Sequence, residues 1–177
     1  MRHRTRHRSL AICGLAVAAA VLAACGGATP KGPQSVSGDG FHFTAPAGWQ
    51  VDRTGARITA APERGEELLW VSLARLRRRY RQALWPKVVP ELDKVAAQLA
   101  AQLRSGRIVA RRTIVVAGRR ARSYDIDYEG TSGSLVERIA FVLEGRREYQ
   151  LLCRWRVQAP DLGKTACAAF IATFRLV

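Results

Sequence analysis

The sequence predicts an α+β fold in which helices flank an antiparallel β-sheet, and three observations support this class. Between residues 108 and 157, four stretches rich in strand-forming residues follow one another across short turns, which indicates antiparallel pairing. Residues 90–106 carry apolar side chains every three or four positions, as an amphipathic helix does. Residues 164–172 repeat this helical pattern near the end of the chain.

The first half of the domain is predicted to contain four short strands. They cover residues 41–43, 49–51, 57–60 and 67–76. Pro46 and Gly48 end the first strand, and Gly55 separates the second from the third. The fourth stretch contains Trp70 and Val71 and is apolar enough for a buried central strand.

A helix is predicted over residues 90–106. Pro90 suits its first turn, where a backbone N–H has no partner, and Glu91 and Asp93 suit the positive end of the helix dipole. Gly106 is placed to end it. One apolar stripe is formed by Leu92, Val95, Ala96, Leu99 and Leu103. This stripe is expected to pack on the sheet.

Two hairpins follow the predicted helix. Their strands cover residues 108–117, 121–129, 135–143 and 147–157, with Gly118 and Gly145 in the turns. The last strand alternates well and places Tyr149, Cys153 and Trp155 on one face. The terminal helix at 164–172 then follows.

Residues 1–24 have the plan of a secretory signal peptide. Four arginines and no acidic residue precede an apolar run at residues 10–24, which spans about 22 Å as a helix and falls short of a bilayer core of about 30 Å. No adjacent arginine pair occurs in this leader, so the general secretory route is expected.

The end of the apolar run, Leu22-Ala23-Ala24-Cys25, resembles the lipobox of bacterial lipoproteins. The resemblance implies that a diacylglycerol is attached to the sulfur of Cys25 and that cleavage makes Cys25 the new N-terminus. Acyl chains there would anchor the protein to the outer face of the cytoplasmic membrane. The alternative is an ordinary signal peptide in which Cys25 is incidental.

Residues 25–39 are predicted to be the lipidated cysteine and a flexible tether, because glycine, proline, serine and threonine dominate them. The folded domain is assigned to residues 40–177. Cys153 and Cys167 lie within it. In an oxidising compartment they are expected to form a disulfide that clips the terminal helix to the preceding strand, the alternative being two buried free thiols.

The chain is strongly basic, with a formal charge of +15, and removing the four leader arginines leaves +11. A candidate anion-binding patch consists of Arg75, Arg77, Arg78, Arg79 and Arg81, and further arginines occur at 111–112 and 119–122. An exported protein rarely meets nucleic acid. The expected partners are therefore phospholipid headgroups, an anionic envelope polymer or a membrane protein. The alternative is a solvated basic face that reflects the preference for arginine over lysine in this chain.

Recognised catalytic and metal-binding motifs are absent from the sequence, including H-E-x-x-H, C-x-x-C, the P-loop and G-x-S-x-G. His42, the one histidine after residue 24, is expected to be an ordinary surface or packing residue. Asp125, Asp127 and Glu137 are candidates for carboxylate chemistry, the alternative being acids on a solvated strand face. No catalytic residue, metal or cofactor beyond the acyl lipid on Cys25 is predicted.

Three short motifs resemble the PsbP-like lipoproteins, including the LpqN/LpqT type. They are Phe41-x-Phe43-x-x-Pro46-x-Gly48-Trp49, Val116-Ala117-Gly118-x-x-Ala121 and Phe170-Ile171-x-x-Phe174-Arg175, and they occur in the family's order. The resemblance implies an α-β-α sandwich around an antiparallel sheet. It implies binding or assembly modules and no single shared activity.

These observations predict a membrane-anchored, extracytoplasmic lipoprotein that acts as a non-enzymatic binding or assembly module of the cell envelope. One alternative is a carrier of a lipid or small apolar ligand, with tryptophans and leucines lining a space between sheet and helix. Another is an envelope hydrolase that depends on Asp125, Asp127 or Glu137.

Overall fold

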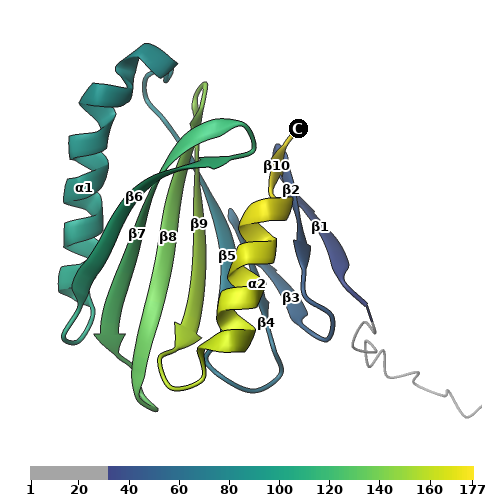
Figure 1. Ribbon diagram of the computed structural model, residues 1–177. Coiled ribbons are helices and arrows are strands. Elements are labelled where there is room, and N and C mark those ends of the chain that lie inside the picture. The colour runs from purple at the N-terminus through teal and green to yellow at the C-terminus, as the bar shows by residue number, and fades with distance from the viewer. Residues whose placement is uncertain (1–31) are drawn as a thin grey trace, which may run out of the picture.

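A computed structural model describes residues 32–177 and contains two antiparallel sheets and two α-helices (Figure 1). The larger sheet has seven strands in the order β3-β4-β5-β9-β8-β7-β6, and the smaller has the order β1-β2-β10. The strands are β1 Gln34–Gly38, β2 Phe41–Ala45, β3 Gln50–Thr54, β4 Arg57–Ala61, β5 Leu68–Arg75, β6 Arg107–Val116, β7 Arg119–Glu129, β8 Ser134–Glu144, β9 Arg147–Arg156 and β10 Arg175–Leu176. The predicted α+β class is confirmed.

Tight turns set the hairpins of the large sheet. Ala117 and Gly118 join β6 to β7, and both have positive φ angles, 50° and 71°. Such a two-residue turn matches the twist of the strands it connects. Gly145, with φ 59°, serves the turn between β8 and β9. Pairing of β5 with β9 then joins the N-terminal strands to the C-terminal hairpins.

Helix α1 (Trp85–Gln102) covers one face of the large sheet, where Leu92 and Ala96 pack against Tyr124 and Phe141. A short 3-10 helix, η1 (Gln82–Leu84), leads into it. The predicted start near Pro90 is wrong, because the helix begins at Trp85 and another proline, Pro86, occupies its first turn. Pro90 lies on the exposed side within the helix, where it removes one backbone hydrogen bond.

A polar contact ties α1 to the sheet. Asp93 accepts hydrogen bonds from Arg122 Nε at 3.0 Å and from the Tyr124 hydroxyl at 2.6 Å. Burial tends to raise the pKa of Asp93, but these hydrogen bonds outweigh it and hold the pKa below its ordinary value. Burial and the bond to Asp93 raise the pKa of Tyr124, so its phenol remains neutral.

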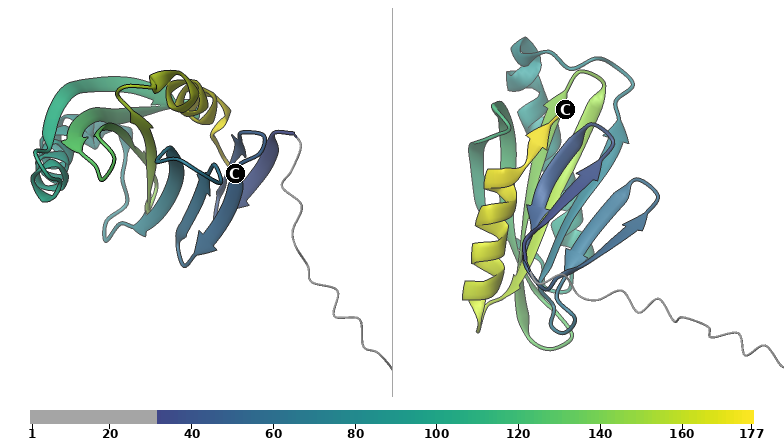
Figure 2. Two further views of the ribbon diagram at one scale, coloured as in Figure 1. Left: turned by 90° about the horizontal axis from the view of Figure 1, so that it is seen from below. Right: turned by 90° about the vertical axis from the view of Figure 1, so that its right-hand side faces the viewer.

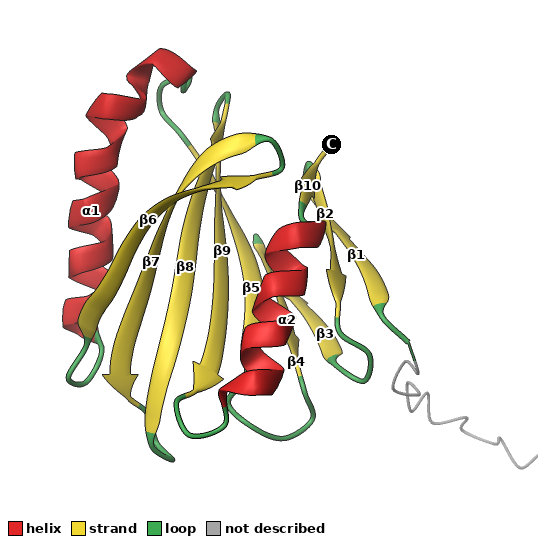
Figure 3. Cartoon of the chain, in the orientation of Figure 1, coloured by secondary structure: helices red, strands yellow, loops and turns green. Residues whose placement is uncertain are grey.

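Helix α2 (Pro160–Thr173) covers the opposite face of the large sheet and begins one turn earlier than predicted, at Pro160. Phe170 packs on Phe43 with ring centroids 4.9 Å apart, so α2 also supports the small sheet. Gly163 lies against Trp155, where a side chain would have no room. Figures 2 and 3 show the two helices and the small sheet around the large one.

The N-terminal boundary of the domain differs from the predicted one. Residues 34–38 were assigned to the flexible tether, but they form strand β1, which pairs with β2 from Gln34 to Gly38. Val36 is 2% exposed and belongs to the core on the α2 face. The segment is short and mostly polar, and it is held by backbone pairing and one apolar side chain, so composition alone indicates a linker.

Candidate functional site

The longest run of arginines follows strand β5 and is held firmly against the sheet. The backbone N–H of Leu76 donates to the carbonyl of Arg146 at 2.9 Å, and that of Tyr80 donates to Gly145 at 2.6 Å. The Tyr80 ring is buried in the α1 cluster, whereas Arg77, Arg78, Arg79 and Arg81 are exposed. Burial raises the pKa of Tyr80, with Arg120 opposing this shift and Glu144 adding to it. The buried, neutral Tyr80 thus holds the exposed arginines on either side of it in a fixed position.

A second connection brings more arginines to the same end of the molecule. Arg119 and Arg120 of the β6–β7 hairpin surround a hollow of about 590 Å³ together with Arg79 and Arg81. Arg119 pairs with Glu144. We call this surface the basic end, and it consists of Arg77, Arg78, Arg79, Arg81, Arg119 and Arg120.

Most of the basic end lacks an acidic partner. Within residues 32–177, no carboxylate forms an ion pair with Arg77, Arg78, Arg79, Arg81 or Arg120. Five neighbouring guanidinium groups therefore keep their charge available to an anion from solution.

Three of the other arginines singled out by the sequence are used within the fold. Arg75 lies 3.7 Å from Asp39 in the β1–β2 turn, so its charge is partly balanced. Arg122 pairs with Asp93 beneath α1. Arg112 pairs with Asp125 on the α2 face. The candidate patch thus retains four of its five predicted members and gains Arg119 and Arg120.

An apolar groove of about 500 Å³ adjoins the basic end, beside the start of α1. Leu76, Leu84, Val88 and Val95 contribute to its walls, and Leu84 is 38% exposed. Trp85, next to the arginine run in sequence, is instead buried in the α1 cluster.

The three carboxylates considered for catalysis do not converge. Asp125 faces Arg138 across the β7–β8 pair, whereas Glu137 faces Ile126, so the two acids lie on opposite faces of the sheet. Arg138 donates to Asp125 at 2.7 and 2.9 Å, and Arg154 donates to Glu137 at 2.6 and 2.9 Å. A carboxylate site that combines Glu137 with Asp125 or Asp127, as the hydrolase alternative would need, is therefore not formed.

Salt bridges also determine the ionisation of Asp125. Burial tends to raise its pKa, but hydrogen bonds from Arg138 and Arg112 outweigh it and hold the pKa below its ordinary value. A general acid needs the opposite shift, towards neutral pH. Asp125 is therefore ionised at neutral pH, where it is the partner of two arginines.

The tryptophans do not line a common pocket. Trp49 and Trp155 belong to the core on the α2 face, and Trp85 belongs to the cluster under α1. Trp70 lies beneath Arg57, with the guanidinium carbon 4.9 Å from the ring centroid. The described residues thus do not form the tryptophan- and leucine-lined pocket that the alternative of an apolar-ligand carrier would need.

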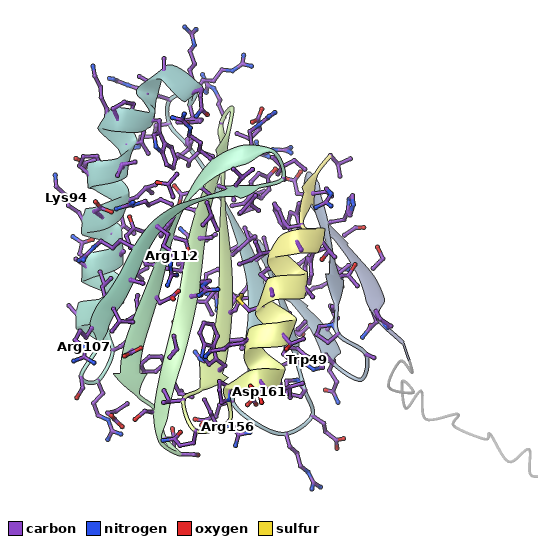
Figure 4. All side chains as sticks on the ribbon, viewed as in Figure 1. Trp49, Lys94, Arg107, Arg112, Arg156 and Asp161 are labelled. Carbon is purple, nitrogen blue, oxygen red and sulfur yellow. A yellow bond between two sulfur atoms is a disulfide. The ribbon has the colours of Figure 1, made fainter. Side chains whose placement is uncertain are left out.

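Cys153 of β9 and Cys167 of α2 form a disulfide, with Cα atoms 5.4 Å apart (Figure 4). The bond clips the terminal helix to the sheet, as the sequence predicted. Cys25, the predicted lipidation site, lies outside the described residues.

Two further features of the described residues bear on the class of site. No group of histidine, cysteine, aspartate or glutamate residues within 32–177 is arranged to hold a metal ion. None of the helices in that range combines the length and apolar character needed to span a bilayer. His42, in β2, is partly buried and pairs in register with Arg175 of β10.

Comparison with known proteins defines the class of fold. No family model and no curated protein sequence matches the chain. PsbP (CyanoP) from Synechocystis sp. PCC 6803 superposes with a TM-score of 0.63 at 15% identity, covering 88% of this chain and 99% of that one.

Another similar structure is LpqN of Mycobacterium tuberculosis, described as involved in cell envelope biogenesis. Its TM-score is 0.55 at 11% identity, with 82% of this chain and 90% of that one covered. A protein from Bacteroides thetaiotaomicron gives 0.57 at 9% identity, with 85% of this chain and 49% of that one covered. The domain therefore has a PsbP-like fold, as the sequence resemblance implied.

Proposed function

We propose that this protein is an exported lipoprotein, anchored to the outer face of the cytoplasmic membrane through acyl chains on Cys25. Its domain is a non-enzymatic module that binds an anionic polymer of the cell envelope through the basic end. The observation that carries the binding proposal is the group of five neighbouring arginines without an acidic partner among residues 32–177. The shared fold with an envelope-biogenesis protein supports the setting.

The position of β1 favours a polymer over lipid headgroups. Asp39, in the β1–β2 turn, pairs with Arg147 at 3.0 Å and with Arg75, which places this turn at the basic end. Strand β1 runs five residues from Gln34 to that turn, about 17 Å at the usual rise. A chain attached to the membrane ahead of Gln34 therefore holds its basic end away from the lipid headgroups, where it can meet a polymer of the envelope.

The binding energy of such a surface is electrostatic and sensitive to salt. Each cation near an anionic surface contributes about 1 kcal/mol, and screening at high ionic strength removes most of it for exposed groups. Binding through the basic end should accordingly weaken when salt is added.

Residues 26–177 are a suitable unit for the test, because they contain both sheets, both helices and every residue of the two core clusters. The probes are poly(glycerol phosphate), polygalacturonate and vesicles of phosphatidylglycerol and phosphatidylcholine in equal amounts. The test variant is the triple substitution R77Q/R78Q/R79Q. Its control, R64Q/R111Q/K164Q, removes the same charge from the β4–β5 loop, β6 and α2, at exposed positions that form no ion pair with any described residue.

We expect the test variant to bind the polymers about tenfold or more weakly, and the control to change affinity much less. Equal losses in the two variants would leave net charge as the explanation and contradict a defined site. Tight binding to vesicles, with weak binding to both polymers, would assign the basic end to the membrane instead.

A further inference from the structure

Helix α2 leaves part of its face of the large sheet uncovered, on the side of β6 and β7 (Figure 1). An open cleft of about 890 Å³ lies there, within the range of roughly 300–1,000 Å³ typical of small-molecule sites. Its apolar walls come from Ile114 of β6 and from Ala168 and Ile171 of α2. The cleft lies across the β6–β7 hairpin from the basic end, and Val115 and Gly118 border both.

Three arginines give the cleft an excess of positive charge. Arg112 and Arg138 share one carboxylate, that of Asp125, at 2.9 Å and 2.7 Å. Arg175 donates to the carbonyls of Ala172 and Phe174, and has no acidic partner among residues 32–177. The three arginines thus have one acidic partner among the described residues, Asp125, and none of the residues that line the cleft is acidic.

Arg138 is also held in place for recognition. Its guanidinium carbon lies 5.4 Å from the centroid of the Trp155 ring, and its two bonds to Asp125 fix its plane. A positioned guanidinium group recognises a carboxylate or phosphate better than a mobile one, because less side-chain entropy is lost on binding.

Ser123 marks the floor of the cleft. It is 1% exposed, it lies opposite Arg112 in the β6–β7 pair, and its hydroxyl has no hydrogen-bond partner among the described residues. A buried hydroxyl without a partner is destabilising, so such groups are rare in native structures and each one requires an explanation, such as a bound ligand. This observation is independent of the arginines.

We propose that the cleft binds an organic anion, with its carboxylate or phosphate group held by Arg112, Arg138 and Arg175 and its apolar body along Ile114 and Ile171. Charge and shape both select this class. A neutral apolar molecule would leave the two excess positive charges unmatched, and a small inorganic anion would leave the apolar walls exposed to water.

Calorimetric titration of residues 26–177 tests the proposal with octanoate, octyl phosphate, octanamide, acetate and inorganic phosphate. We expect octanoate or octyl phosphate to bind at least about tenfold more tightly than neutral octanamide and than either small anion. The tighter of the two alkyl anions distinguishes a carboxylate from a phosphate ligand. Octanamide that binds as well as octanoate, or acetate and phosphate that bind as well as the alkyl anions, would overturn the proposal.

Variants locate the binding. Arg175→Gln, at an exposed position of β10, is expected to weaken binding about fivefold or more. Lys164→Gln, near the start of α2, removes the same charge outside the cleft and should leave binding unchanged. Saturating ligand should shift the amide resonances of Ser123 and Ile171. Unchanged binding in Arg175→Gln, or resonance shifts confined to the basic end, would contradict the assignment. The basic-end variant R77Q/R78Q/R79Q should bind octanoate normally, so the two proposals fail separately.

Discussion

At the scale of single residues, ion pairing decides which charged groups are structural and which are free. Asp125 is 7% exposed and takes both Arg112 and Arg138, so it stabilises the α2 face. Glu137, which is 8% exposed and lies on the other face, accepts hydrogen bonds from Arg154 and, at 3.0 Å, from the Tyr128 hydroxyl. The two buried candidate acids, Asp125 and Glu137, are thus held by local donors, whereas Asp127 has a single longer contact with Arg107 at 3.5 Å.

The Asp125 cluster predicts a pH dependence of stability. A carboxyl whose pKa is lower in the folded state stabilises the fold above its unfolded pKa of about 3.9, and this stability is lost as pH falls through the folded pKa. Asp125→Asn should therefore lower the free energy of unfolding at pH 7 by roughly 2–3 kcal/mol.

Urea denaturation measures this effect. The difference between wild type and Asp125→Asn should shrink as the pH is lowered from 5 towards 2, because the wild-type carboxyl then becomes protonated. A difference that stays constant over this window would show that the charge of Asp125 does not contribute.

At the scale of elements, the C-terminal helix depends on its attachment to the sheet. Only one face of α2 is buried, mainly through Ala166, Cys167 and Phe170, and the disulfide to β9 joins it to the central strands. The crosslink closes a 15-residue loop, which in the chain-entropy account is worth roughly 3 kcal/mol.

Cys153→Ser should accordingly lower the melting temperature, on the order of 10 °C for a domain of this size. Cys167→Ser should produce a similar loss, and the double variant should lose little more than either single one. Differential scanning calorimetry of exported protein provides the measurement. Two titratable thiols at these positions in untreated protein would argue against the crosslink.

At the scale of the whole molecule, loops far apart in the chain meet at one end. The β5–η1 connection and the β6–β7 hairpin supply the basic end, and the β8–β9 turn holds the arginine run in place through Gly145 and Arg146. Strand β1 starts at Gln34, away from the basic end, and runs towards it. The basic end therefore lies remote from Gln34, which agrees with the proposed attachment of the chain at Cys25.

The proposed anchor makes a cellular prediction. Cys25→Ser should remove the acyl chains and move the protein from the membrane fraction to the soluble fraction, because those chains are the proposed attachment to the membrane. Fractionation and intact mass measure the two effects. Membrane retention and mass that remain as in the wild type would reject lipidation at this residue.

The sequence by itself determined the features that depend on neighbouring residues. The alternation of β9, the glycines of the β6–β7 and β8–β9 turns and the apolar stripe of α1 predicted most elements to within a few residues. The proximity of Cys153 and Cys167 and the exposed run from Arg77 to Arg81 were also predictable, because both lie within short segments.

The tertiary structure decided everything that depends on pairing between distant segments. Strands β1 and β10 carry too little local pattern to be recognised, and they exist because β2 offers backbone partners on both sides. The register of β7 against β8 put Asp125 and Glu137 on opposite faces, and a shift of one residue would have brought them together. Packing of the hairpins and the helix likewise brings Arg119 and Arg120 next to the arginine run. The same packing brings Ser123 next to Ile171 and Arg175 in the cleft. Local periodicity does not encode which surfaces meet, so the sequence alone could not predict either arrangement.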